Sequence, residues 1–83
     1  MITIFSKSYC PYCKSAKDFL SSIGREYIDI DLEHNPEKMA EVVQISGMMT
    51  VPQIFDGDII RENLIWGYDD MIKQYNAGKI FQN

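Results

Sequence analysis

The sequence predicts an α/β fold in which three helices flank a four-stranded mixed sheet, in the chain order β-α-β-α-β-β-α. Apolar or alternating segments of strand length recur between stretches whose apolar residues have the spacing of an amphipathic helix. A glycine follows each of the three helical stretches, where a helix commonly ends. An Asp-Gly pair follows the third strand and signals a turn to an antiparallel neighbour. We expect one domain over residues 1–83, because a chain of 83 residues supports a single core.

The first strand and the first helix are predicted over residues 1–5 and 12–23. Residues 1–5 are apolar and rich in β-branched side chains, which is typical of a buried strand. Pro11 is suited to the first position of the helix, where no backbone N–H is needed, and Gly24 ends the helix. The apolar stripe of this helix consists of Ala16, Phe19, Leu20 and Ile23.

A second strand and a second helix follow. Residues 26–31 alternate between apolar and polar side chains, which predicts a strand with one partly exposed face. Because a helix connects the first two strands, they should be parallel and joined by a right-handed crossover. The second helix is expected to begin at Asn35-Pro36 and to stop at Gly47.

The last part of the chain is predicted to form a hairpin and a helix. Residues 51–55 have the composition of a third strand. The Asp56-Gly57 pair predicts a tight turn into a fourth strand at Ile59-Ile60, antiparallel to the third. The final helix is expected from about Tyr68 to Ala77, before Gly78.

Charge and hydropathy exclude several classes of protein. The net charge of −4, from twelve acidic and eight basic residues, argues against a nucleic-acid-binding protein, which would carry a basic stripe. No apolar run approaches transmembrane length, and the first five residues lack the features of a targeting segment. We therefore expect a cytoplasmic protein that binds neither nucleic acid nor membrane. We also expect it to be a monomer.

Two cysteines, Cys10 and Cys13, carry the candidate chemistry. A bridge between them would close a very short loop, so it would constrain little of the unfolded chain. Cys10 lies where the first helix begins, and unpaired amides and the helix dipole favour a thiolate there. Cys13 lies one turn further along and should be less exposed. We expect Cys10 to be the nucleophile of a disulfide exchange and Cys13 to be the resolving thiol.

A zinc site is one alternative for the cysteine pair. Structural zinc usually has four ligands. Beyond the two cysteines the chain offers only His34, distant in sequence, and carboxylates. We therefore expect no metal.

Three segments resemble the glutaredoxin family, in the family's order and over nearly the whole chain. Residues 8–13, Ser-Tyr-Cys-Pro-Tyr-Cys, look like its dithiol active site. Residues 50–55, Thr-Val-Pro-Gln-Ile-Phe, are similar to the segment that carries its cis-proline. Residues 65–70, Ile-Trp-Gly-Tyr-Asp-Asp, resemble the glycine pair and aspartate that precede the last helix. The resemblance implies a thioredoxin-like fold.

The resemblance also implies a function. Such a protein would be a glutathione-dependent thiol–disulfide oxidoreductase that reduces protein disulfides and glutathione mixed disulfides through a Cys10/Cys13 dithiol. Glutathione would be a co-substrate, and no cofactor would be tightly bound. The partners would be glutathione and disulfide-containing or glutathionylated proteins. Small dithiol relatives often reduce ribonucleotide reductase, but nothing in this sequence selects that substrate.

The resemblance further assigns roles to individual residues. The Val51–Pro52 bond would be cis, so that the Val51 backbone turns its polar groups toward Cys10. Asp69 would pair with the α-ammonium group of glutathione, and Lys7 would face its glycine carboxylate. The residues expected to bind glutathione are Lys7, Tyr12, Thr50, Val51, Pro52, Asp69 and Asp70, and those expected to shape the site are Pro11, Trp66 and Gly67.

Two positions depart from the family pattern. Trp66 occupies the first position of the usual glycine pair, where a glycine would let a ligand approach the backbone closely. The indole could pack on the protein, or it could narrow the groove or stack on the ligand. Met49 stands where many relatives have a basic residue, so one carboxylate contact would be missing.

Two other functions remain open at this stage. One is a thioredoxin-like reductant that a flavoprotein reductase supplies with electrons; the absence of a tryptophan just before Cys10 speaks against it. The other is an iron–sulfur carrier, a dimer that holds a cluster through Cys10 and bound glutathione. Relatives that do this usually lack a proline after the first cysteine, whereas this chain has Pro11.

Overall fold

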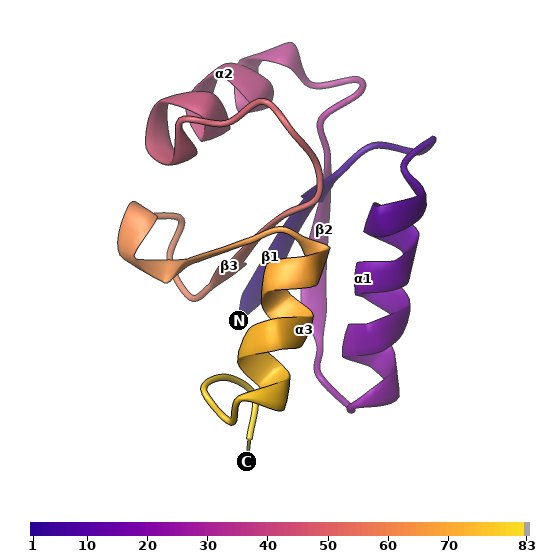
Figure 1. Ribbon diagram of the computed structural model, residues 1–83. Helices are drawn as coiled ribbons and strands as arrows, with labels where there is room; N and C mark the ends of the chain where they lie inside the picture. Colours follow the sequence, from indigo (N-terminus) through magenta and orange to yellow (C-terminus); the bar gives the residue numbers. More distant parts are fainter. Residues whose placement is uncertain (83) are drawn as a thin grey trace.

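The computed structural model describes residues 1–82 and confirms the predicted α/β class and order of elements (Figure 1). A short 3₁₀ turn precedes the fourth strand. In chain order the elements are β1 (Ile2–Ser6), α1 (Pro11–Ser22), β2 (Tyr27–Asp31), α2 (Pro36–Ser46), β3 (Gln53–Asp56), η1 (Arg61–Asn63), β4 (Leu64–Trp66) and α3 (Tyr68–Asn76).

The four strands form one mixed sheet in the order β2-β1-β3-β4. β1 and β2 are parallel, as their connection through a helix predicted. β3 is antiparallel to both of its neighbours, β1 and β4. All five residues of β1 are buried, because this strand is paired on both edges and covered on both faces.

Helices cover both faces of the sheet, and the alternation of side chains along the strands divides the core into two clusters. Ile4 and Ile54 face α1 and α3, which lie on one side of the sheet and bring Leu20 and Met71 to the same cluster (Figure 1). On the other face α2 covers a second cluster, which contains Phe5, Leu32, Val42, Phe55 and Leu64. This arrangement fixes the start of α1, the start of β3 and the start of α3 at the same end of the sheet.

The prediction of a fourth strand at Ile59-Ile60 is wrong. The fourth strand is Leu64–Trp66 instead. Ile65 is buried in the first cluster and Leu64 in the second. Ile60 is 46% exposed, and its backbone N–H donates to Asp58 O at 2.8 Å. A longer loop therefore replaces the tight Asp-Gly turn. The chain pairs at Leu64-Ile65 rather than at Ile59-Ile60, because Leu64 and Ile65 can both be buried, on opposite faces of the sheet.

Among residues 1–82, no helix is long and apolar enough to cross a membrane.

Candidate active site

Cys10 is the N-cap residue of α1. Its extended backbone conformation leads into Pro11, the first residue of the helix. The Cys13 backbone N–H donates to Cys10 Sγ at 3.2 Å. The sulfur therefore accepts a hydrogen bond from one of the amides that have no partner within the helix at its start. Cys10 as a residue is partly exposed. A sulfur in this position can act as a nucleophile once its proton has left.

Cys13 lies one turn further into α1 and is only 1% exposed. Burial, reinforced by its hydrogen bond with the Cys10 side chain, raises the pKa of the Cys13 thiol to about 12. Cys13 is therefore a protonated thiol at neutral pH. The two cysteines are free in this structure, and their positions match the predicted difference in exposure.

The segment before β3 approaches Cys10 from the other side. The Val51–Pro52 peptide bond is cis, as the resemblance implied. The Cys10 thiol donates to the Val51 carbonyl oxygen, with an S···O distance of 3.7 Å. The backbone of Val51 therefore lies beside the sulfur, where it can contact a molecule bound to Cys10.

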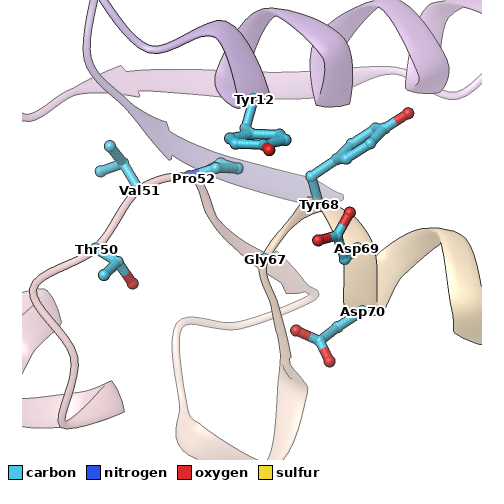
Figure 2. Close-up of a pocket in the computed structure, with 8 residues that line it drawn as sticks. All are labelled: Tyr12, Thr50, Val51, Pro52, Gly67, Tyr68, Asp69 and Asp70. Carbon is cyan, nitrogen blue, oxygen red and sulfur yellow. The ribbon is translucent and has the colours of Figure 1, made fainter.

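A groove of about 220 Å³ opens next to this contact (Figure 2). Thr50, Val51 and Pro52 lie on one side of it, and the start of α3 lies on the other side. The Tyr12 ring lies between Pro52 and the Tyr68 ring. The centroids of the Tyr12 and Tyr68 rings are 6.2 Å apart. The groove therefore has aromatic rings and the Thr50–Pro52 segment in its walls. Its lining consists of Tyr12, Thr50, Val51, Pro52, Gly67, Tyr68, Asp69 and Asp70.

Two carboxylates mark the far side of the groove. Asp69 and Asp70 lie in the first turn of α3, and both are exposed. Gly67, the N-cap residue, has no side chain to satisfy the first amides of the helix. A carboxylate is stabilised at such a helix start, and it can also pair with a cationic group of a ligand.

Besides the two cysteines, three predicted site residues do not line the groove: Lys7, Pro11 and Trp66. The Lys7 ammonium group lies 6.0 Å from the centroid of the Tyr9 ring. Trp66 packs against the second core cluster, and the Arg61 guanidinium lies 5.6 Å from its ring centroid. Trp66 has a φ of 79°, the left-handed conformation that favours glycine. The structure thus places the indole on the protein rather than in the groove.

Three further residues take part in the site. Tyr68 lines the groove, and its position between the glycine and the aspartates could have indicated this. Ser8 donates from both its hydroxyl and its backbone N–H to Glu33 Oε1, at 2.6 and 3.3 Å, which ties the loop before Cys10 to the β2–α2 connection. Gln53 is buried beneath the Thr50–Pro52 segment.

Within residues 1–82, no three histidine, cysteine or acidic side chains gather in a way that could hold a metal ion.

The family model described as glutaredoxin matches residues 2–60 of the chain. A glutaredoxin from Neisseria meningitidis is 37% identical over 78 residues, which cover 93% of this chain and 87% of that protein. Glutaredoxin 3 from Escherichia coli K12 is 40% identical over 70 residues, which cover 84% and 80%. The solved buckwheat glutaredoxin–glutathione complex is 30% identical, with a TM-score of 0.81 and coverage of 95% of this chain and 71% of that chain.

Proposed function

The chain belongs to the glutaredoxin family, and we propose that it is a glutathione-dependent thiol–disulfide oxidoreductase that uses Cys10 and Cys13. Membership of this family implies thiol–disulfide exchange. The observation that carries the proposal is the position of Cys10 Sγ, which receives the Cys13 N–H at the start of α1 and lies 3.7 Å from the Val51 carbonyl oxygen. A nucleophilic sulfur therefore adjoins a peptide group and a groove.

In the first step the Cys10 thiolate attacks the glutathionyl sulfur of a mixed disulfide. A new disulfide forms between Cys10 and glutathione as the old one breaks, and the substrate leaves as a thiolate that takes a proton from solvent. The thiolate of a second glutathione then attacks the glutathionyl sulfur on Cys10. This step releases oxidised glutathione and restores the Cys10 thiolate.

Cys13 provides a second route for resolving the intermediate. Its sulfur can attack Cys10 Sγ, forming a Cys10–Cys13 disulfide as the bond to glutathione or to a substrate protein breaks, and the departing thiolate takes up the proton that Cys13 loses. Two glutathione molecules reduce that disulfide again. Because the pKa of Cys13 is raised to about 12, this thiol does not start the reaction. We therefore expect Cys13 to be needed for protein disulfides and dispensable for glutathione mixed disulfides.

The groove would hold the glutathionyl group. The Thr50–Val51 backbone can pair with the peptide groups of glutathione as an added strand would. Asp69 and Asp70 present negative charge for its α-ammonium group, and the Tyr12 ring can pack beside its sulfur. Lys7 would meet a glycine carboxylate by leaving its position near the Tyr9 ring. The proposal includes a cytoplasmic location, since glutathione and reduced thiols predominate there.

A glutathione-coupled reduction assay on three forms of the protein tests this function. The substrates are the mixed disulfide of cysteine and glutathione, and a disulfide-bonded protein. Cys10→Ser should be inactive toward both. Cys13→Ser should reduce the mixed disulfide and fail on the protein disulfide. Loss of all mixed-disulfide reduction in Cys13→Ser, or activity in Cys10→Ser, would contradict the scheme.

A further inference from the structure

The segment that presents Thr50 and Val51 to the groove has no regular secondary structure of its own. It runs from the end of α2 to the start of β3 and is exposed at Met49, which is 72% accessible to solvent. Its backbone must nevertheless be held in place if it is to pair with a ligand, because a peptide group guides a partner only when its direction is fixed.

One buried side chain holds this segment from below. Gln53 is fully buried, and its Nε2 donates to Met48 O at 2.9 Å and to Thr50 O at 3.0 Å. Both amide hydrogens are thus used on carbonyl groups two residues apart. Ser46, which is 2% exposed, provides a third hydrogen bond to the segment, because its Oγ accepts from the Met48 N–H at 3.1 Å.

Stability alone does not account for glutamine at this position. The Gln53 Oε1 is buried and has no hydrogen-bond partner within residues 1–82. A buried acceptor without a partner is unfavourable to folding. An apolar side chain of the same shape would avoid that cost, but it would leave the carbonyl groups of Met48 and Thr50 without this donor. Glutamine differs from such an apolar side chain in the two hydrogen bonds that Nε2 donates to the segment before β3.

We infer that Gln53 is a positioning residue, which fixes the carbonyls of Met48 and Thr50 so that the Val51 peptide is held beside Cys10 for the glutathionyl group. This inference rests on the proposed function. Gln53 is not among the hydrogen-bond partners of Cys10 Sγ, which receives a hydrogen bond from the Cys13 N–H, on another element. Gln53 can reach the sulfur only through the Val51 peptide, whose carbonyl oxygen makes a long contact of 3.7 Å with Cys10 Sγ. The main contribution of Gln53 is therefore to binding.

Gln53→Met tests the inference, since methionine has a similar length and lacks the amide donors. Loss of two neutral hydrogen bonds that orient the binding segment should raise KM for the cysteine–glutathione mixed disulfide by roughly tenfold. We expect kcat and the rate of Cys10 alkylation by iodoacetamide to stay within about twofold. The melting temperature should change by only a few degrees, because removal of the unpaired Oε1 offsets the loss of the donor to the two carbonyl groups. The matched control is Gln44→Met on the exposed surface of α2, which should behave as wild type.

The inference is overturned if Gln53→Met keeps the wild-type KM, or if it lowers kcat and the melting temperature together, as a merely structural residue would. Should Gln53→Met not fold, Gln53→Leu decides by the same KM criterion, because leucine also lacks the amide donors. If wild type itself shows no glutathione-coupled activity, the proposed function has failed. The backbone amide NMR shifts of Thr50 and Val51 then decide, since they should differ between Gln53→Met and wild type and would be identical if Gln53 does not position them.

Discussion

The burial of Cys13 should make this thiol almost unreactive in the folded protein. Its pKa is raised from 9.0 to about 12, chiefly by burial. At pH 8 a thiol of pKa 9.0 is about one-tenth thiolate, whereas a thiol of pKa 12 is ionised in about one molecule in ten thousand. Folding should therefore slow the alkylation of Cys13 by about a thousandfold, because the thiolate is the reacting species.

The assay uses Cys10→Ser, in which Cys13 is the sole thiol. This variant lacks the contribution of Cys10 to the raised pKa, so burial alone should slow alkylation by less than a thousandfold but well over tenfold. Iodoacetamide incorporation is followed by mass spectrometry in buffer and in concentrated urea, at the same pH. Cys13→Ser serves as the control, because its partly exposed Cys10 should be alkylated readily in both conditions. Rates for Cys13 that agree within about tenfold between folded and unfolded protein would refute the reasoning, since the shielding of this thiol would then be absent.

Three other predictions concern stability and binding. The pKa of Cys13 is higher in the folded state than in the unfolded state. The protonated Cys13 thiol therefore contributes fully to stability below about pH 9, and this contribution is lost as pH rises toward 12. The free energy of unfolding should fall by about 4 kcal/mol over that range. Urea unfolding of the reduced protein between about pH 8 and pH 11 should therefore show a steeper loss in wild type than in Cys13→Ala; equal slopes would contradict this. Asp69→Asn should raise KM for the mixed disulfide by about fivefold with little change in kcat, while the exposed control Asp58→Asn should leave KM unchanged; an unchanged KM in Asp69→Asn would remove this carboxylate from the site. Trp66→Gly should lower the free energy of unfolding by about 1–2 kcal/mol. The loss of indole packing against Arg61 and the core should exceed the gain from placing glycine at a left-handed backbone position. A variant that is more stable than wild type in thermal unfolding would show that the indole packing contributes little.

Most of the fold could be predicted from local patterns. The parallel pairing of the first two strands followed from the helix between them, and the start of α1 followed from Pro11. The fourth strand could not be assigned in this way, because Ile59-Ile60 and Leu64-Ile65 are both apolar pairs. Only the completed sheet decides between them, since Leu64 and Ile65 reach the two opposite clusters while Ile60 stays exposed.

The candidate site was predictable where neighbouring residues carry it. The cysteine pair, the segment around Pro52 and the aspartates in the first turn of α3 each lie in a short stretch of sequence. The structure brings them to one groove or its edge. Trp66 was ambiguous, because its direction depends on a left-handed backbone and on Arg61. Gln53 was overlooked, because a polar residue in a strand is ordinary until its burial and its two acceptors are known.

The most direct test of the account is to find where glutathione becomes attached. Cys13→Ser should be incubated with oxidised glutathione, digested and mapped by mass spectrometry. We expect one glutathione per chain, on Cys10, and its complete release when reduced glutathione is added. A protein that remains unmodified at Cys10, or an adduct that reduced glutathione does not remove, would contradict the assignment of this sulfur as the nucleophile.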